Sequence, residues 1–239
     1  MSSSQKTRLL VMSGWGSPKI FGDLFDSVYQ HGNGNNIYAL NLGPGDTLVL
    51  EGGTDINPNF YGQRPINVTQ NPDTQRDAAE SIMMKKVIAA KGSILGICRG
   101  AQFITAKAGG ELIQHVTSHH GNHMMITHTG KPILTNSFHH QMMFPFGLPK
   151  EEYKILAHTP QRFSRVYLIE DEEDVKNHLP KDFVEPEVVW YPKIRGLGIQ
   201  GHPEFVGFNP THPNKGPLAE FVNYSRNLVK EYILNDLPV

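Results

Sequence analysis

A short glycine-flanked segment, Gly96-Ile-Cys98-Arg-Gly100, constrains the fold of this chain more than any other feature. It stands between the apolar stretch 93–97 and a helical pattern over residues 99–108. Glycines on both sides of a central residue permit a sharp strand-to-helix turn, because side chains there would clash as the two backbones approach. The pattern predicts that the Cys98 sulfur stands at the carboxyl end of a strand and the amino end of a helix, where the helix dipole favours a thiolate. A small cysteine buried between packing glycines is the alternative.

The rest of the sequence predicts an α/β fold, because short apolar stretches alternate with helical patterns as in a mainly parallel sheet covered by helices. The length favours one domain over residues 1–239. Strands are predicted at residues 9–12, 37–40, 47–50, 93–97, 166–169, 188–191 and 197–200. Helices are predicted from Ser17-Pro18 to about residue 31, behind a capping box at 74–77, after Cys98, and over about 216–235. The helix behind the capping box is expected to bury Ala79, Ile82, Met83, Val87 and Ala90.

Composition narrows the functional classes. The 22 Lys and Arg residues balance 23 Asp and Glu residues, so the chain lacks the basic surplus typical of nucleic-acid-binding proteins. No apolar run approaches the roughly 18 residues of a membrane span, and the polar start does not have the pattern of a signal peptide. The single cysteine excludes an intrachain disulfide and favours a reducing compartment, so we expect a cytoplasmic protein.

A nucleophilic cysteine requires a base and a group that orients the base. The segment Gln200-Gly-His202-Pro-Glu204 follows the predicted strand 197–200 and offers both. Residues two apart in an extended chain point to the same side, so Glu204 can turn back to the imidazole of His202 and fix its tautomer. A surface His-Pro-Glu turn is the alternative.

Two adjacent glycines supply a third element of a candidate site. Gly52 and Gly53 follow the predicted strand 47–50, where their N–H groups can face the mouth of a site. The N–H of Arg99, at the start of the predicted helix, is also free to donate. These groups could form the two halves of an oxyanion hole, although a plain Gly-Gly turn is equally consistent with the pattern.

Four segments in this order resemble the class I glutamine amidotransferase superfamily, and most closely its branch of free-standing γ-glutamyl hydrolases, the peptidase C26-like proteins. They are Glu-Gly-Gly-Thr-Asp-Ile-Asn-Pro-Asn-Phe-Tyr-Gly (51–62), Gly-Ile-Cys-Arg-Gly-Ala-Gln (96–102), Asn-Ser-Phe-His-His-Gln (136–141) and Gln-Gly-His-Pro-Glu (200–204). Arg76-Asp77 and Glu80 also fit that branch. The resemblance extends from about Thr47 to Glu204, and its second and fourth segments are specific as a pair.

The resemblance implies a flavodoxin-like α/β fold with a small antiparallel extension and a Cys98–His202–Glu204 triad. It implies an oxyanion hole from the N–H groups of Gly53 and Arg99. It implies no cofactor and no metal. Its expected binding partner is glutamine or another small γ-glutamyl substrate, and dimers would be unsurprising by analogy. The residues expected near the substrate are Gly52, Gln102, Asn136, Ser137 and His139.

The chain also departs from the family pattern. Gly201 stands where an aromatic or aliphatic residue is usual, which predicts a more open pocket or a less firmly held His202. Residues 160–190 carry an acidic insert instead of the usual Asp-Gly hairpin. We therefore expect the chemistry to be better defined than the specificity.

Three functional classes follow from these motifs. The first is a thiol amidohydrolase that cleaves a glutamine or γ-glutamyl side-chain amide on its own. The second is a glutaminase subunit that supplies ammonia to a separate synthetase. The third is a member without catalysis that serves in binding, which the complete set of Cys98, His202 and Glu204 disfavours.

Three other patterns give weaker signals. Seven histidines crowd residues 115–140, but no carboxylate is spaced in the sequence to complete a metal site, so a polar loop beside the active site is favoured. The acidic run 170–174 is typical of a solvated loop. A dinucleotide-binding turn at 13–19 is disfavoured because its third glycine is replaced by Lys19.

Overall fold

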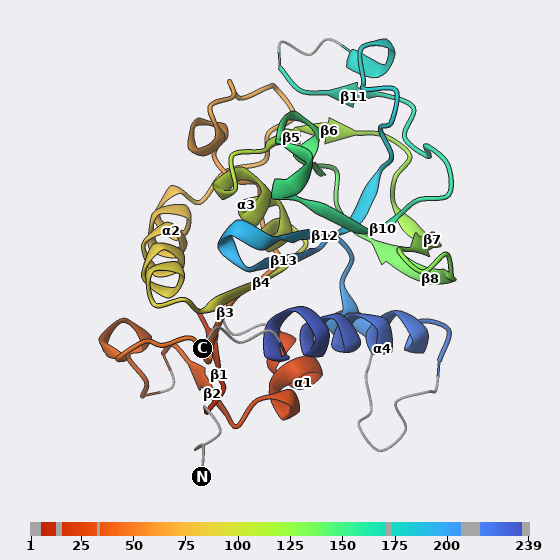
Figure 1. Ribbon diagram of the computed structural model, residues 1–239. Coiled ribbons are helices and arrows are strands. Elements are labelled where there is room, and N and C mark those ends of the chain that lie inside the picture. The colour runs from red at the N-terminus through yellow and green to blue at the C-terminus, as the bar shows by residue number, and fades with distance from the viewer. Residues whose placement is uncertain (1–5, 13–15, 33, 171–173, 207–215, 236–239) are drawn as a thin grey trace.

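The protein was analysed as a computed structural model that describes residues 6–12, 16–32, 34–170, 174–206 and 216–235. One nine-stranded sheet forms its centre (Figure 1). Five strands run parallel, in the order β2 (Ser27–Gln30), β1 (Arg8–Val11), β3 (Asp46–Leu50), β4 (Ser93–Ile97) and β13 (Gly196–Ile199). Four more continue the sheet in antiparallel pairing, in the order β12 (Pro186–Tyr191), β10 (Lys154–His158), β7 (Gly121–Thr127) and β8 (Pro132–Ser137). The predicted α/β class with a mainly parallel core and an antiparallel extension is confirmed.

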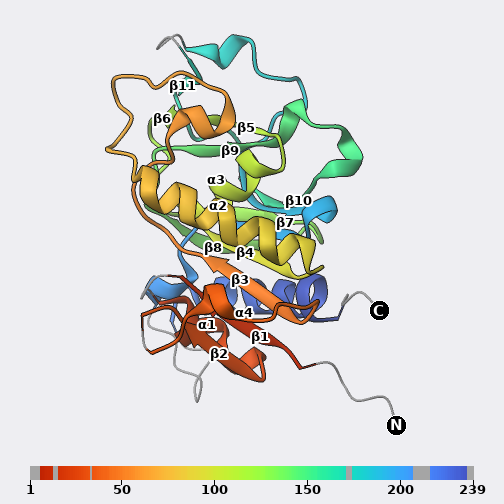
Figure 2. The same cartoon turned by 90° about the vertical axis from the view of Figure 1, so that its left-hand side faces the viewer.

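The central strands are buried on both faces, so their side chains divide between two cores. Leu9, Val49 and Leu95 join the core beneath α1 (Ser17–Phe21) and α4 (Ala219–Leu228). Leu10 and Leu48 point the other way, into the core beneath α2 (Thr74–Ala89) and α3 (Arg99–Lys107). Figures 1 and 2 show these two helical layers on opposite faces of the sheet. A segment in π-helical form, Val229–Leu234, extends α4.

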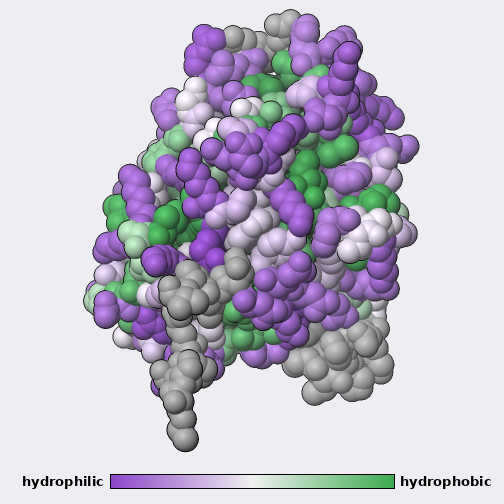
Figure 3. All heavy atoms as spheres, in the orientation of Figure 1, coloured by the Kyte–Doolittle hydropathy of each residue, from purple (hydrophilic) through white to green (hydrophobic). Residues whose placement is uncertain are grey.

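Two small antiparallel sheets lie beyond the main sheet, toward the top of Figure 2. They are β5 (Glu111–Ile113) with β9 (Met142–Phe144), and β6 (His115–Val116) with β11 (Tyr167–Leu168). Among the helices that the structure describes, none has the length and apolarity needed to cross a membrane. The face in Figure 3 is mostly hydrophilic, with its apolar side chains in small separate patches. Short 3-10 helices occupy Gly22–Leu24, Ile37–Ala39, Pro58–Tyr61, Pro145–Gly147, Lys150–Glu152, Val175–Asn177, Pro192–Ile194 and Pro203–Val206.

Several local predictions near the amino end were wrong. Residues 37–40 contain a 3-10 turn capped by Asn36, because the Asn36 side chain accepts a hydrogen bond from Tyr38 N and diverts the backbone from a strand. The helix from Ser17 ends at Phe21, and residues 27–30 form strand β2 instead. The turn residues 13–15 lie outside the described part of the chain.

The second helix is shifted and rotated relative to its prediction. Its N-cap is Asp73, which accepts from Arg76 N, and not Thr74. Ile82 is 53% exposed, whereas Asp77 and Glu80 are buried. The prediction followed the apolar periodicity, but this helix turns two carboxylates inward because Arg99 lies there to pair with them.

Candidate active site

Cys98 forms a strained turn between β4 and α3. Its φ of 50° and ψ of −107° are unusual for a residue other than glycine, and its N–H donates to Ile199 O at 2.8 Å. A Cβ added at Gly96 would lie 2.4 Å from the backbone of Gly100, and one added at Gly100 would lie 1.9 Å from Leu50 O. The two glycines are therefore required by the close approach of helix and strand.

The structure brings His202 and Glu204 to this cysteine from the end of β13. His202 Nδ1 lies 2.7 Å from Glu204 Oε1, and its side chain also hydrogen-bonds with Cys98. Burial lowers the pKa of His202, but its bonds with Cys98 and Glu204 outweigh burial and raise that pKa to about 10. The imidazole is thus held in its protonated form at neutral pH, between the Cys98 sulfur and the Glu204 carboxylate.

Asn136 fixes the backbone of His202. Its Oδ1 accepts from His202 N at 2.7 Å, and its Nδ2 donates to His202 O at 2.9 Å. Asn136 is not among the residues that line the cavity beside Cys98. The structure thus gives this side chain a part in positioning the imidazole, and its contact with substrate stays a prediction.

The Gly201 backbone lies in a tight space, contrary to the expectation of an open pocket or a loose histidine. A Cβ at Gly201 would lie 2.7 Å from Asn136 O and 2.9 Å from the Phe221 ring. Glycine at this position lets strand β8 and helix α4 approach the loop of His202 closely, which holds the histidine instead of releasing it.

Gly52 lies against the same two side chains, whereas Gly53 lies against Arg76 and Arg99. A Cβ at Gly52 would lie 2.8 Å from His202 Cε1 and 3.8 Å from Cys98 Cβ. The Arg76 guanidinium donates to Gly52 O at 3.0 Å and to Glu51 O at 2.8 Å. The N–H of Gly53 points away from Arg76, because the carbonyl and the N–H of one trans peptide point in opposite directions.

A buried ion network supports this backbone. Arg76 pairs with Glu80 at 2.7 Å, and the Arg99 side chain pairs with both Asp77 and Glu80. Arg99 is 1% exposed, so its guanidinium is part of the interior, and the predicted contact with an oxyanion concerns its backbone N–H alone. The network joins the Gly52 loop, α2 and the residue that follows the nucleophilic candidate.

A small cavity of about 70 Å³ opens beside Cys98. Gln102 and His139, both predicted to contact substrate, line it together with Gln141. Gln102 Nε2 and His139 Nδ1 both bond the Gln141 carbonyl, at 3.0 and 2.7 Å. Burial and the nearby His119 lower the pKa of His139 to about 3, so its ring is neutral. Its buried Nε2 has no hydrogen-bond partner.

Gln141 is a residue that the sequence interpretation did not select. It is 1% exposed, and neither its Oε1 nor its Nε2 has a hydrogen-bond partner. Unsatisfied amide atoms beside a cavity are costly unless a ligand supplies partners. The only sequence signal was its place at the end of the segment 136–141.

Ser137 does not line the cavity that contains Cys98. Its hydroxyl donates to His119 O at 2.8 Å, and it lines a neighbouring hollow of about 650 Å³ instead of the small cavity. Phe138 and His139 border both spaces. The two spaces therefore adjoin, and Cys98 lines only the smaller one.

Two exposed aromatic rings flank His202. Phe205 stacks on the imidazole with ring centroids 4.3 Å apart, and Phe138 meets it edge-on at 5.8 Å. Phe138 is 63% exposed and Phe205 is 51% exposed. They shield the imidazole while leaving an apolar surface beside the site.

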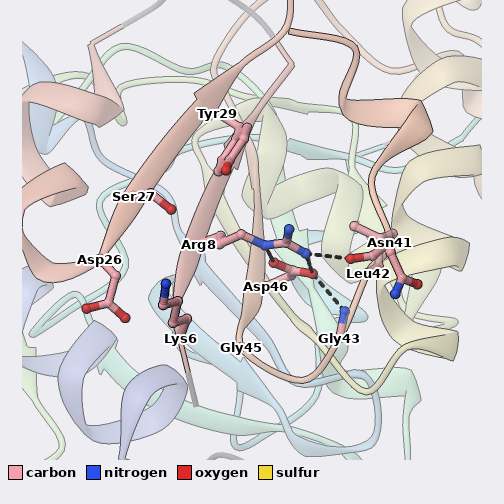
Figure 4. Close-up of a pocket in the computed structure, with 10 residues that line it drawn as sticks. All are labelled: Lys6, Arg8, Asp26, Ser27, Tyr29, Asn41, Leu42, Gly43, Gly45 and Asp46. Carbon is pink, nitrogen blue, oxygen red and sulfur yellow. Dashed lines mark hydrogen bonds and ion pairs between the residues drawn. The ribbon is translucent and has the colours of Figure 1, made fainter. Parts of the chain in front are cut away.

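Another hollow, of about 690 Å³, lies at the opposite edge of the sheet, beside the amino ends of β1 and β3 (Figure 4). Its Arg8 guanidinium is bound by Asp46 and by the Asn41 carbonyl. The acidic run 170–174 does not contribute to the candidate site either. Glu170 pairs with Arg64, and residues 171–173 lie outside the described part of the chain. We therefore place the candidate site at the carboxyl ends of β3, β4 and β13.

Comparison with known sequences agrees with this placement. The peptidase C26 family profile matches residues 34–204. The glutamine amidotransferase-like protein YvdE of Lactococcus lactis is 28% identical over 166 residues, which cover 61% of this chain and 67% of YvdE. Protein NtpR of Enterococcus hirae is 29% identical over 182 residues, which cover 66% of each chain.

Comparison of structures addresses the fold alone. A glutamine amidotransferase from Thermotoga maritima superposes with a TM-score of 0.53 at 12% identity. The match covers 95% of this chain and 95% of that one. The mixed, largely parallel sheet and its helical layers are thus those of a class I glutamine amidotransferase structure.

Proposed function

The chain belongs to the peptidase C26 family of class I glutamine amidotransferase-like proteins, and on this premise we propose that it is a thiol amidohydrolase for glutamine or γ-glutamyl amides. The observation that carries the proposal is the position of His202, hydrogen-bonded to Cys98 on one side and to Glu204 on the other. That arrangement supplies a nucleophile, a base and a group that orients the base. A thiol nucleophile needs reducing conditions, which favours the cytoplasm.

The proposed reaction begins with attack of the Cys98 thiolate, paired with the protonated His202, on the side-chain amide carbon of the substrate. An S–C bond forms as the carbonyl oxygen becomes an oxyanion, which the N–H groups of Gly53 and Arg99 stabilise. His202 gives its proton to the leaving nitrogen, the C–N bond breaks, and ammonia or an amine departs. A γ-glutamyl thioester remains on Cys98.

Water completes the cycle. His202, now neutral and still held by Glu204, accepts a proton from the water that attacks the thioester. The S–C bond breaks, the γ-carboxylate of glutamate forms, and the sulfur recovers its starting state. No cofactor is needed, because each proton lost in one step is returned in the other.

The cavity favours recognition of the glutamyl end by neutral polar groups. Gln141 offers an unpaired amide, and His139 Nε2 offers an unpaired lone pair that can accept from an ammonium group. Gln102 holds the backbone that carries them. We assign the 650 Å³ hollow to the amine leaving group, since it adjoins the cavity of the cysteine at Phe138 and His139.

A substrate screen of the isolated protein tests this function. Glutamate release is measured from glutamine and from γ-glutamyl amides with small, long and aromatic amines, with Cys98→Ala as the control. We expect release from at least one γ-glutamyl compound, lost in the variant, and a glutamyl adduct on Cys98 in mass spectra of quenched reactions. Release at the same rate by both chains would overturn the proposal.

A glutaminase subunit is the second candidate function. The exposed rings of Phe138 and Phe205 beside His202 favour it, because a partner enzyme could cover them and adjust the imidazole. Such a subunit would hardly hydrolyse glutamine alone and would do so when its synthetase is added. Rapid turnover by the isolated chain, unchanged in Phe205→Ser, would exclude this candidate.

A further inference from the structure

A second group of buried imidazoles and carboxylates lies where the loop before β7 meets β7 and β12. His119 Nε2 is 3.0 Å from Glu187 Oε1, and His123 Nε2 is 2.9 Å from the same oxygen. These three donor atoms all lie within 4.8 Å of one another. The sequence interpretation found no carboxylate for these histidines, because Glu187 is 64 residues beyond His123 and reaches them only through the pairing of β12 within the sheet.

An outer layer of contacts fixes the first histidine. His119 Nδ1 lies 3.2 Å from Glu185 Oε2. Glu185 in turn accepts from Phe163 N, Ser164 N and the Tyr167 hydroxyl, each at 2.8 Å. A carboxylate on the far nitrogen of an imidazole, itself held by several donors, is the usual support of a metal-binding histidine.

The inner carboxylate is incompletely satisfied. Glu187 is 1% exposed, and its Oε2 has no hydrogen-bond partner. Glu187 faces both His119 and His123, whereas Glu185 contacts only the other ring nitrogen of His119. A buried carboxylate oxygen without a partner is costly, and a cation placed between the imidazoles and Glu187 would remove that cost.

We propose that His119, His123 and Glu187 form a binding site for a divalent transition metal ion of the zinc type. Two imidazole nitrogens and one carboxylate are a common ligand set for zinc, with a water molecule in the fourth position. Bonds of about 2.0–2.2 Å place tetrahedral ligand atoms roughly 3.3–3.5 Å apart, so the two histidine–carboxylate distances of 2.9 and 3.0 Å must widen slightly to admit the ion. His123 is 11% exposed at its side chain, and the hollow lined by His119 gives the ion a route in.

The ion would connect β12 to the segment that borders the proposed substrate space. Ser137 donates to the carbonyl of His119, and the His139 ring lies 5.0 Å from the His119 ring. The Cys98 reaction needs no metal, so this site serves to hold that segment in place. It is independent of the proposed amidohydrolase activity.

Zinc binding by the full chain, prepared without a histidine tag and treated with chelator, tests the inference. Isothermal titration with zinc chloride is run in the Cys98→Ala background, which removes the thiol as a rival ligand. We expect one zinc ion per chain. His123→Gln should weaken binding roughly 100-fold or more, and Glu185→Gln by about 10–100-fold, whereas His120→Gln, an exposed neighbour in the same segment, should bind as before.

X-ray absorption of the zinc complex of the unmodified chain keeps the test valid if a variant fails to fold. Imidazole and oxygen ligands at about 2.0–2.1 Å, without sulfur at about 2.3 Å, are expected. Zinc–sulfur bonds, binding lost in Cys98→Ala, equal loss in His120→Gln, or no binding at all would each overturn the site. None of these measurements depends on whether the protein hydrolyses an amide.

Discussion

His202 and His119 are both buried imidazoles bound to a carboxylate, and they differ in what meets the second ring nitrogen. His202 has Glu204 on Nδ1 at 2.7 Å and the Cys98 sulfur as its other hydrogen-bonding neighbour. His119 has Glu187 on Nε2 at 3.0 Å and another carboxylate, Glu185, on Nδ1 at 3.2 Å. Both rings are more than nine-tenths buried.

The same pair of groups can therefore serve two purposes. Bonds with Glu185 and Glu187 outweigh burial and raise the pKa of His119 to about 9, so without a metal this ring is an imidazolium enclosed by acceptors. It has no nucleophile to exchange a proton with. His202 is also protonated at neutral pH, but it hydrogen-bonds with the sulfur of Cys98, which lines a cavity. A buried imidazole becomes suited to catalysis through this asymmetry.

The largest expected effect comes from removing the sulfur. Cys98→Ala should lower glutamate release by at least about 10⁴-fold, because no other group can form the thioester. Thermal stability and the His119 cluster should be unaffected, since the two sites share no hydrogen bond. Activity is measured by glutamate release and folding by calorimetry. Residual turnover within tenfold of the native rate would show that Cys98 is not the nucleophile and that His202 does not differ from His119 in this way.

The next largest effect tests the cluster without metal. In chelator, Glu187→Gln should lower the free energy of unfolding by about 3 kcal/mol, because it leaves the charged His119 with one carboxylate fewer in the interior. The matched control is Glu220→Gln, which removes an exposed pair with Lys131 and should cost less than about 1 kcal/mol. Urea denaturation at pH 7 measures both. Equal losses would mean that the buried network contributes no more than a surface pair.

The two sites also differ in how far the sequence could predict them. The Cys98 turn and the His202–Glu204 pair are local patterns, set by glycines or residues within four positions of one another. The contacts of Arg99 with Asp77 and Glu80, and of His119 with Glu187, join segments that only the folded sheet brings together. The apolar periodicity predicted that Ile82 is buried, but α2 turns Asp77 and Glu80 inward and leaves Ile82 exposed.

Asn136 and Gln141 show the same limit at finer scale. The segment 136–141 was singled out by its resemblance to the family, yet spacing alone could not show that Asn136 turns to the His202 backbone while Gln141 turns to the cavity. In a short strand end and its loop, side-chain direction depends on the surrounding packing. A sequence motif marks the segment and leaves each side chain's partner open.

A smaller effect is expected from moving the imidazole without removing it. Gly52→Ala places a methyl group 2.8 Å from His202 Cε1, so the ring must shift away from Cys98. We expect kcat to fall by about 10–100-fold with a smaller change in KM, because misplacement of about 1 Å disrupts proton transfer. Gly43→Ala is the control, since nothing lies within 4 Å of a Cβ there. Equal kinetics for both variants would show that the His202 ring can accommodate the methyl group without leaving its catalytic position.

The smallest effect concerns Glu51, a buried carboxylate near Glu204 that lacks an imidazole partner. Burial raises its pKa to about 7, against the hydrogen bond from the Ser17 hydroxyl, and the charge of Glu204 adds to the rise. The folded chain thus keeps a proton that the unfolded chain releases above about pH 4.5, so this group's contribution to stability falls as pH rises from about 4.5 to 7.

Glu51→Gln removes that dependence while keeping an acceptor for Ser17. The variant should be more stable than the native chain by about 2 kcal/mol at pH 8 and nearly equal to it at pH 4.5. Urea denaturation of both chains at the two pH values measures the difference. Glu187→Gln should not show this gain, because bonds with His119 and His123 overcome burial and lower the pKa of Glu187 to about 2. If the Glu51 difference were the same at both pH values, that carboxyl would be ionised throughout, and the contrast between a buried acid with an imidazole and one without would not hold.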